Sequence, residues 1–291
     1  MLDKFPIQEI ENREKGYPET LKTITKPPQK IFFRGVLPLA GEKCFAIVGT
    51  RRASDYGKEA AFNFAKTLSL SGITIVSGMA LGIDTWAHKG ALSGNGKTIA
   101  VLGAGLGESS IYPQENLKLA KEILEKGGGI VSEYIDESPG FKGNFLQRNR
   151  LISGLSLGVL VIEAKIKSGA LNTASWAKKQ NKKVFALPGA VNWPNSRGCH
   201  LLIKQGVKLA ETPKDILEEL GLKTILQRNK TPQGNTEQAI YNCLKNGPLH
   251  IDKIIEITKI KSPEALGCMS LMEIQEKVKN FGANIYGLVK N

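Results

Sequence analysis

Residues 44–54, CFAIVGTRRAS, decide how the rest of the chain can be interpreted. The stretch opens with a short apolar run, which is typical of a strand buried on both faces of a parallel sheet. The run breaks at Gly49, and Ser54 is a suitable N-cap for the amphipathic segment that follows. A strand, a glycine turn and a helix direct backbone N–H groups at one point, so the pattern favours anion binding. The alternative is a tight structural turn in which Arg51 and Arg52 are merely solvated.

The same alternation of apolar runs and amphipathic segments continues toward the C-terminus. Strands that alternate with crossover helices predict an α/β fold with a doubly wound, mostly parallel sheet that is covered on both faces. The expected strands are residues 44–48, 73–76, 98–102, 130–133, 158–162, 183–186 and 207–210. The expected helices are residues 54–70, 83–92, 114–126, 145–155 and 170–180.

Composition divides the chain into four parts. Residues 1–40 are expected to form an irregular N-terminal arm with an edge strand at 30–34, because proline is excluded from central strands. Residues 41–222 contain the α/β pattern, and residues 223–235 have the composition of a linker. Three short helical segments and a glycine-containing hairpin in residues 236–291 suggest a small winged-helix-like domain. A generic helical cap is the alternative. The segments are residues 237–245, 251–258, 263–276 and 277–289.

The charge of the chain indicates its class of partner. The formal net charge is +13 over 291 residues, which favours a polyanion. Residues 232–291 contain 7 Lys/Arg and 6 Asp/Glu, a net of +1, so +12 belongs to residues 1–231. The large domain is therefore the expected electrostatic footprint. No apolar run could span a bilayer and the N-terminus lacks a signal-peptide core, so we expect a soluble, cytoplasmic protein.

Known catalytic and cofactor motifs are missing. The four cysteines are far apart without a CxxC pair, which argues against a zinc site. The turn at 103–108 approaches GxGxxG but has Glu108 at the third glycine position, and there is no GxxxxGK[ST] motif. The three histidines do not assemble with a nucleophile and an orienting group. We therefore expect no enzymatic activity, metal or cofactor.

Glycine turns follow five of the expected strands. In an open parallel sheet these turns lie together at the carboxyl edge, where ligands bind, so the five predict one binding face. In the second turn, Asp84 most simply complements a helix dipole, and His88 is either a contact residue or a packed histidine. The turns contain Gly49, Ser77-Gly78, Gly103-Ala104-Gly105, Lys167-Ser168-Gly169 and Pro188-Gly189.

Residues 145–154, FLQRNRLISG, add a third basic segment. On a helix, Arg148 and Arg150 point about 200° apart, so they share one surface only near the helix N-terminus. Each could instead pair with a carboxylate in the core. Together with the arginines of the first turn and Lys167, they would form a positive channel for a nucleic-acid backbone. Aromatic side chains available for base stacking are Phe141, Phe145 and Trp193.

Taken in order, these motifs resemble the DNA-processing protein A family (DprA, also called Smf). The resemblance covers about residues 17–220 and continues more weakly across 235–290. In two respects the chain differs from the family pattern: because its lead is short, we expect no N-terminal helical module of the kind that the family often has, and His200 stands where Asn is expected. The motifs are YP (17–18), PP (27–28), RG (34–35), IVGTR (47–51), SGMA (77–80), GID (82–84), AH (87–88), VLG (101–103), Gly105, YP (112–113), Phe145, RNR (148–150), ISGL (152–155), VIEA (161–164), KSGAL (167–171), TA (173–174) and ALPG (186–189).

The resemblance implies an extended Rossmann-like domain that binds single-stranded DNA without sequence preference. It also implies a homodimer that protects incoming DNA and loads the RecA recombinase during natural transformation, with no known enzymatic activity. The small, nearly neutral C-terminal part would serve protein contact or weak duplex binding. The residues expected to hold DNA or phosphate are Gly49, Thr50, Arg51, Arg52, Ser77, Gly78, Met79, Gly82, Gly103, Gly105, Phe145, Arg148, Asn149, Arg150, Ser153, Lys167, Ser168 and Gly169.

Two alternatives stay open at this point. Related Rossmann-like sheets hydrolyse the glycosidic bond of nucleoside monophosphates with a carboxylate and an arginine beside a glycine-rich phosphate turn. Glu163 could supply the carboxylate, but the PGGxGT-type turn of those enzymes is reduced here to residues 188–190, PGA. A winged-helix transcription regulator with a ligand-sensing domain would instead bind a specific duplex.

Overall fold

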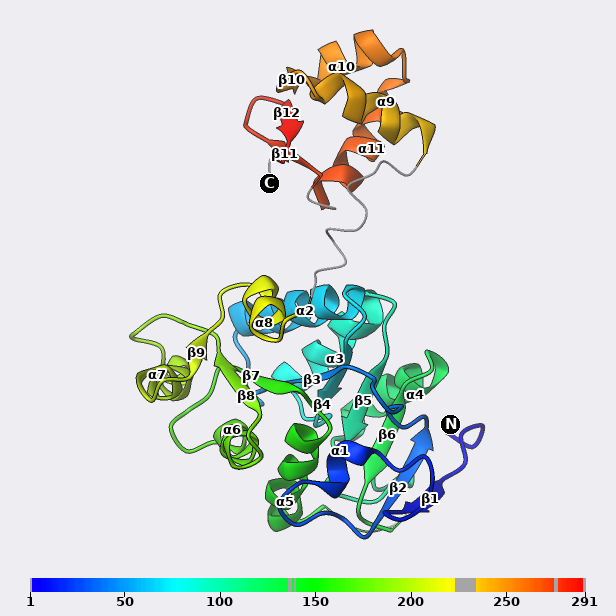
Figure 1. Cartoon of the computed structure of the whole chain (residues 1–291), viewed down its shortest axis with the longest axis vertical. Coiled ribbons are helices and arrows are strands. Elements are labelled where there is room, and N and C mark those ends of the chain that lie inside the picture. Colours follow the sequence, from blue (N-terminus) through cyan, green and yellow to red (C-terminus); the bar gives the residue numbers. More distant parts are fainter. Residues whose placement is uncertain (1, 136–137, 139, 223–233, 275–276, 290–291) are drawn as a thin grey trace. The chain divides into compact units, whose positions relative to one another are not determined.

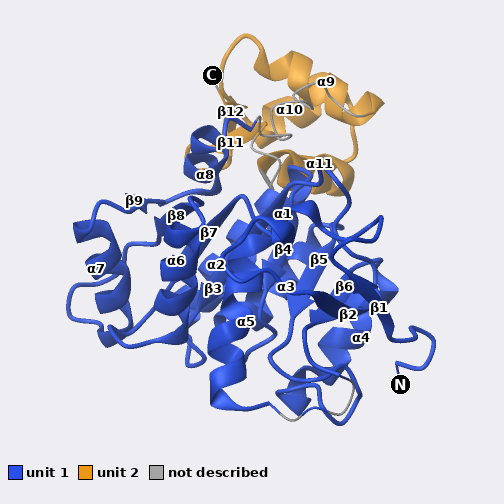
Figure 2. Cartoon of the chain, turned by 60° about the horizontal axis from the view of Figure 1, so that its bottom comes forward, with its two compact units in different colours: residues 1–223 blue, residues 224–291 orange. Residues whose placement is uncertain are grey.

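The computed structural model describes residues 2–135, 138, 140–222, 234–274 and 277–289. The chain divides into two compact units, unit 1 (residues 1–223) and unit 2 (residues 224–291), which Figure 2 distinguishes by colour. Unit 1 includes the expected N-terminal arm. Most of the predicted linker, residues 223–233, lies outside the described residues.

Unit 1 is built on a nine-stranded sheet with the order β1-β2-β6-β5-β4-β3-β7-β8-β9 (Figure 1). The strands from β3 to β9 are parallel, whereas β1 and β2 are antiparallel to their neighbours. The predicted Rossmann-like, mostly parallel α/β fold is therefore confirmed. The strands are β1 (Gln8–Glu11), β2 (Lys30–Gly35), β3 (Cys44–Gly49), β4 (Thr74–Ser77), β5 (Thr98–Val101), β6 (Gly129–Ser132), β7 (Gly158–Ile162), β8 (Lys183–Ala186) and β9 (Lys208–Leu209).

Helices cover both faces of this sheet. One face packs against α2, α3, α4 and α8, and the other against α1, α5, α6 and α7. All five predicted helices are present. The one expected at 114–126 is split into a 3-10 turn and α4, and the one expected at 145–155 begins at Lys142. The helices are α1 (Glu19–Lys22), α2 (Asp55–Leu70), α3 (Ile83–Ser93), α4 (Leu117–Glu125), α5 (Lys142–Gly154), α6 (Gly169–Lys179), α7 (Arg197–Lys204) and α8 (Pro213–Glu219), with 3-10 turns at Gln114–Asn116 and Pro194–Ser196.

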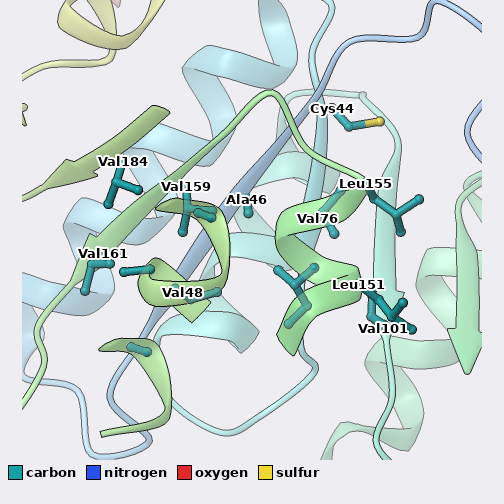
Figure 3. Close-up of a cluster of buried hydrophobic side chains, with 14 of the residues drawn as sticks. Cys44, Ala46, Val48, Val76, Val101, Leu151, Leu155, Val159, Val161 and Val184 are labelled. Atoms are coloured by element: carbon teal, nitrogen blue, oxygen red, sulfur yellow. The ribbon is translucent and has the colours of Figure 1, made fainter. Parts of the chain in front are cut away.

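Side-chain alternation along the strands builds the two layers of the core. On β3, Phe45 and Ile47 pack toward α2 and α3, whereas Ala46 and Val48 pack toward α5 and α6. Figure 3 shows the second layer, in which Leu151 of α5 approaches the valines of the central strands. Successive strand residues face opposite sides, so a continuous apolar run is the sequence that a doubly covered strand requires.

The order of the strands reverses at β3. The chain adds β4, β5 and β6 on one side of β3, and then crosses over to add β7, β8 and β9 on the other side. Strands β3 and β7 are therefore neighbours, although residues 50–157 separate them in the sequence. In open α/β sheets, ligands bind outside the carboxyl ends of strands at such a reversal. The fold places the loops after β3 and β7 there.

The N-terminal arm differs from its prediction. Strand β2 was expected at the edge of the sheet, but it pairs with β6 on one side and with β1 on the other, so β1 is the edge strand. The prolines at 27–28 precede β2 and do not interrupt its hydrogen bonds. The first residues are also fixed, because the buried Arg34 guanidinium donates hydrogen bonds to the carbonyl oxygens of Leu2, Phe5 and Leu106.

Unit 2 has the expected three helices and hairpin around a small apolar core. Its antiparallel sheet has the order β10-β12-β11. The winged-helix assignment stays a prediction, as does the role of this unit. No helix in the described part of either unit is long and apolar enough to cross a membrane. The elements of unit 2 are α9 (Asn235–Leu244), β10 (Leu249–His250), α10 (Ile251–Thr258), α11 (Ser262–Ile274), β11 (Val278–Asn280) and β12 (Ile285–Leu288).

Candidate nucleic-acid interface

A cleft of about 620 Å³ lies where the order of the strands reverses. Three segments that are far apart in sequence form its walls: the turn after β3, the start of α5, and the turn between β7 and α6. The expected binding face is therefore a real concave surface. Its residues include Gly49, Thr50, Arg51, Ala80, Asp84, Tyr112, Gly140, Lys142, Phe145, Leu146, Arg148, Asn149, Lys165, Lys167, Ser168 and Gly169.

The turn after β3 presents two exposed arginines. Gly49 allows β7 to approach, because a Cβ atom there would lie 1.9 Å from the carbonyl oxygen of Ile162. The side chains of Arg51 and Arg52 are exposed, and neither guanidinium has a hydrogen bond or ion pair with a described residue. The Arg51 guanidinium lies 5.6 Å from the centre of the Phe145 ring, and Arg51 lines the cleft, whereas Arg52 is not among the lining residues.

The N-terminus of α2 is not an open anion site. Ser54 caps α2 as predicted, accepting a hydrogen bond from Gly57 N–H at 3.1 Å. The Glu163 carboxylate then accepts hydrogen bonds from Ser54 N–H at 2.8 Å and from Ser54 Oγ at 2.5 Å. A protein carboxylate thus fills the position in which we expected phosphate, so this part of the prediction needs correction.

The second glycine turn is occupied in the same way. Gly78 N–H and Ala80 N–H donate to Asp84 Oδ2 at 3.1 and 3.4 Å. Burial raises the pKa of the Asp84 carboxyl. The positive charge of Arg148 and the two backbone N–H groups lower it in part. Ser77, fully buried, donates its hydroxyl to the carbonyl oxygen of Ile47. The predicted phosphate donors of this turn are therefore already satisfied inside the protein.

Two further residues of this turn have structural roles. Met79 is fully buried and has a left-handed backbone with φ of 61°. Gly82 has φ of 80°, and a Cβ atom there would lie 2.3 Å from the carbonyl oxygen of Thr50. Gly82 is needed so that the second turn can pack against the first. Neither residue lines the cleft.

The basic residues of α5 point in different directions, as their spacing predicts. Arg148 lies at the floor of the cleft and is 5% exposed; it donates hydrogen bonds to the carbonyl oxygens of Gly78, at 2.9 Å, and Val101. Burial lowers the pKa of its guanidinium to about 10, against the raising effect of Asp84. Arg150 instead forms an ion pair with Glu133 at 2.5 Å.

Two predicted contacts on α5 thus lie away from the cleft. Arg150 is held by the ion pair inside the protein, and Ser153, fully buried, donates its hydroxyl to Gln180 Oε1 at 2.8 Å. Asn149 does line the cleft, where its amide donates to the carbonyl oxygen of Gly169 at 3.2 Å. Helix α5 therefore supplies the floor of the site, with its charge turned largely inward.

The turn before α6 carries exposed positive charge. Lys165 and Lys167 are exposed, and Ser168 caps α6 by accepting from Leu171 N–H at 3.4 Å. The first turn of α6 has no acidic residue, and a Cβ atom on Gly169 would meet nothing within 4 Å. The N-terminus of α6 lines the cleft, and the first turn of α6 has no carboxylate. The first turns of α2 and α3 each contain an aspartate.

An aromatic pair forms another wall. The rings of Tyr112 and Phe145 lie 5.8 Å apart with an interplanar angle of 48°, and Tyr112 is 53% exposed. Gly103 is buried beneath Phe145, because a Cβ atom there would lie 2.8 Å from Phe145 Cδ1. Gly105 is also buried and donates its N–H to the carbonyl oxygen of Ser138 at 2.9 Å. These two glycines therefore support the wall and are absent from the lining of the cleft.

Among the lining residues that were not predicted as site residues, three are cationic or aromatic: Tyr112, Lys142 and Lys165. Lys165 and Lys142 lie within three residues of predicted site positions. Their closeness to those positions in the sequence could therefore have identified them. For Tyr112 only its place in a family motif pointed to it. Of the other aromatic candidates, Phe141 and Trp193 are exposed but do not line the cleft.

The histidines do not form a catalytic or metal centre. His88 is fully buried, its Nδ1 lies 2.7 Å from Thr98 Oγ1, and burial lowers its pKa to about 3. It is therefore a packed histidine. His200 Nε2 lies 3.0 Å from the carbonyl oxygen of Gly189. Among the described residues, no group of three or more His, Cys, Asp or Glu could hold a metal ion.

Unit 2 contains a separate cavity of about 730 Å³ between the end of α9 and the hairpin. Its walls include Tyr241, Leu244, Phe281 and the buried Lys277, whose ammonium group forms an ion pair with Glu237. None of the predicted site residues lies in this unit. Exposed Lys245 and Lys279 also line this cavity, but the cleft of unit 1 has more exposed cations, namely Arg51, Lys142, Lys165 and Lys167.

Sequence comparison relates the chain to known proteins. The family model of DNA recombination-mediator protein A matches residues 8–221. The chain is 48% identical to protein Smf of Escherichia coli K12 over 204 residues, which cover 70% of this chain and 54% of that protein. It is 41% identical to DprA of Bacillus subtilis over 215 residues, covering 74% of this chain and 71% of the relative. The match thus spans about half the length of the Escherichia coli protein.

Solved structures show the same relationship. DprA of Streptococcus pneumoniae superposes with a TM-score of 0.68 at 39% identity, covering 75% of each chain. DprA of Helicobacter pylori, whose structure is described as giving its single-stranded DNA binding mode, superposes with a TM-score of 0.66 at 34% identity. That match covers 76% of this chain and 98% of the other. With the family model matching most of its length, the chain belongs to the DNA recombination-mediator protein A family, which includes the DprA and Smf proteins.

Proposed function

We propose that the chain binds single-stranded DNA without sequence preference in the cleft between β3 and β7, as part of a role in DNA recombination. One observation carries the proposal: the cleft combines exposed cations with an aromatic pair, of which Tyr112 is exposed and Phe145 is half-buried. The solved Helicobacter pylori relative, described by its single-stranded DNA binding mode, supports the same ligand class.

The cations are available for phosphate. Arg51, Lys142, Lys165 and Lys167 line the cleft, and none of them forms an ion pair with a described residue. The acidic side chains nearest the turns, Asp84 and Glu163, are instead engaged in hydrogen bonds with backbone and hydroxyl groups. The cleft therefore offers net positive charge to a phosphate backbone, which is the source of sequence-independent affinity.

The aromatic wall favours a single strand. Stacking on Tyr112 or Phe145 requires a base that is not stacked inside a duplex. The Arg51 guanidinium near the Phe145 ring would bring a phosphate and its base to adjacent positions. Stacking is indifferent to base identity because every base has a π face. The arrangement thus supports binding without sequence preference.

Fluorescence anisotropy tests the proposal. A labelled single-stranded oligonucleotide and a duplex of equal length are titrated at several salt concentrations, with wild type and the Arg51→Ala/Arg52→Ala variant. We expect preference for the single strand and a salt slope that falls in the variant by about 0.7 for each phosphate that the arginines no longer bind. Arg13→Ala, an exposed arginine beyond edge strand β1, is the matched control. Absence of single-strand binding at low salt would contradict the proposal.

The resemblance extends the proposal to RecA. We propose that a homodimer protects incoming DNA and loads RecA onto it during natural transformation. The description of the family as a recombination mediator supports this extension. The loading role is tested by the rate of RecA nucleation on DNA coated with single-strand-binding protein. The homodimer is tested by measuring the molecular mass of the present chain by light scattering. If the protein does not accelerate RecA nucleation, the loading role is contradicted. If it is a monomer at micromolar concentration, the homodimer is contradicted.

The geometry does not favour the two alternatives. Glu163, the carboxylate considered for a nucleotide hydrolase, is 4% exposed and engaged with Ser54. Helix α11 of unit 2, with the sequence SPEALGCMSLMEI, has no Lys or Arg with which to bind a duplex as a recognition helix. Release of free base from nucleoside monophosphates would support the nucleotide hydrolase instead. Tight binding to one duplex sequence would support the transcription regulator instead.

A further inference from the structure

We infer that Glu163 is a positioning residue that holds the turn of Arg51 and Arg52 in its DNA-binding conformation. This inference rests on the proposed function. Glu163 follows β7, 109 residues from Ser54, yet it contacts both ends of the turn of residues 50–54. Its role would be to fix the backbone from which the two arginines extend.

Three hydrogen bonds join Glu163 to the turn. Its carbonyl oxygen accepts from Thr50 N–H at 2.8 Å, at the first residue of the turn. Its carboxylate accepts from Ser54 N–H at 2.8 Å and from Ser54 Oγ at 2.5 Å, at the last residue. One residue therefore sets the distance between the two ends of the turn.

The surrounding structure is arranged to admit this carboxylate. Glu163 has a left-handed backbone with φ of 52°, a conformation that costs energy for a residue other than glycine and that persists where neighbours enforce it. Gly57, on the first turn of α2, faces the carboxylate, and a Cβ atom there would lie 2.4 Å from Glu163 Oε2. An uncommon conformation and a missing side chain thus combine to bring the carboxylate to Ser54.

The other contacts of the turn also reach its backbone. The side-chain amide of Asn195 donates a hydrogen bond to the backbone carbonyl oxygen of Arg52 at 3.0 Å. The backbone carbonyl oxygen of Asn195 accepts one from Ala164 N–H at 2.6 Å. Ile83 N–H donates to the carbonyl oxygen of Thr50 at 3.2 Å. No described residue bonds either guanidinium. A fixed backbone with free cations loses less entropy when DNA binds than a mobile loop does.

A double-mutant cycle tests this role by anisotropy titration with a labelled oligothymidylate. Glu163→Ala is measured in the wild-type background and in the Arg51→Ala/Arg52→Ala background. We expect a loss of affinity of about 3- to 10-fold in the first, close to the cost of fixing the backbone of one residue of the turn on binding. In the second we expect almost no further loss, because the arginines through which Glu163 acts are gone.

Two further variants separate positioning from general stability. Glu163→Gln keeps its size and one acceptor oxygen, and we expect it to recover most of the affinity. Asp215→Ala removes a comparable carboxylate cap, which accepts from Thr212 N–H at the start of α8, and we expect it to leave affinity unchanged. If Glu163→Ala does not fold, Ser54→Ala takes its place in the cycle.

The outcomes distinguish this inference from the proposed function. Equal losses in both backgrounds, or no loss in the wild-type background, would overturn the positioning role while single-strand binding by wild type still supported the proposed function. Failure of the wild-type protein to bind the oligonucleotide would overturn both.

Discussion

The Asp84 carboxylate accepts a hydrogen bond from the N–H of Gly78 at 3.1 Å, in the centre of the second glycine turn. Glu163 does the same for Ser54 at the start of α2. Two sites with the local geometry of anion holes are thus filled by carboxylates of the protein itself. Under the proposed function, phosphate binding is therefore left to the exposed Arg51, Lys142, Lys165 and Lys167 and to the N-terminus of α6. The proposed site would therefore depend more on side-chain cations than on helix dipoles.

Arg150 and Lys167, both predicted as contacts, should respond differently to replacement by methionine. Arg150→Met breaks a buried ion pair with Glu133, so the free energy of unfolding should fall by about 3 kcal/mol. The salt slope of DNA binding should stay unchanged. Lys167→Met should leave stability within about 0.5 kcal/mol and lower the slope by about 0.7. Urea denaturation and anisotropy measure the two effects. A reduced slope in Arg150→Met without loss of stability would contradict this assignment.

Tyr112 should contribute stacking without charge. Tyr112→Leu removes an aromatic surface that is 53% exposed at the edge of the cleft, so affinity for single-stranded DNA should fall by about 1 kcal/mol or more. The salt slope should equal that of wild type, because the number of bound phosphates is unchanged. Phe141→Leu, which changes an exposed ring outside the lining of the cleft, is the control. Equal losses in the two variants would argue against a specific role for Tyr112.

Gly57 and Gly267 offer a matched pair of helical glycines. Alanine normally stabilises a helix interior by about 0.5–1 kcal/mol relative to glycine. Gly267→Ala in α11 should show this gain, since nothing lies within 4 Å of the added Cβ atom. Gly57→Ala should instead lose stability, because the Cβ atom would lie 2.4 Å from Glu163 Oε2. Thermal unfolding measures both, and stabilisation by Gly57→Ala would show that Glu163 is not held as described.

His88 should make the protein sensitive to acid. Burial, assisted by the charge of Arg148, lowers its pKa to about 3, whereas an unfolded histidine titrates near a pKa of about 6.5. Below about pH 6, the unfolded chain therefore binds a proton that the folded chain excludes. The free energy of unfolding should lose about 1.4 kcal/mol per pH unit from this group down to about pH 4. It should be unaffected by this group above about pH 7.

Urea denaturation between about pH 7 and about pH 4.5 measures that dependence. His88→Asn should remove this contribution, so the stability of the variant should fall less steeply with acid than that of wild type. Other titrating groups affect both proteins equally and cancel in the comparison. Parallel curves for the two proteins would mean that His88 is protonated in the folded state.

The sequence by itself determined the layers of the fold and the edge at which the site lies. Apolar runs and helical periodicity are local properties, so the parallel strands and helices α2 to α6 of unit 1 could be predicted from them. The short helices α1, α7 and α8 were not predicted. The alternation of strands with crossover helices placed the glycine turns at one edge. The opposite directions of Arg148 and Arg150 also followed from helix geometry. Strand β1, QEIE, escaped prediction because four mostly polar residues carry no strand pattern.

Only the tertiary structure decided which groups in the site are free. Asp84 and Gly78 are close in sequence, but Glu163 reaches Ser54 over 109 residues, and Arg150 reaches Glu133 from another element. The local sequence shows where a helix begins and where an arginine stands. Strand order and packing decide which residue forms the hydrogen bond or ion pair with that helix end or that arginine. Long-range pairing with Glu163 therefore filled one expected phosphate site, whereas the other was filled by Asp84 from the same turn and helix start. The exposed cations of the cleft are those of the turn between β7 and α6, together with Arg51 and Lys142.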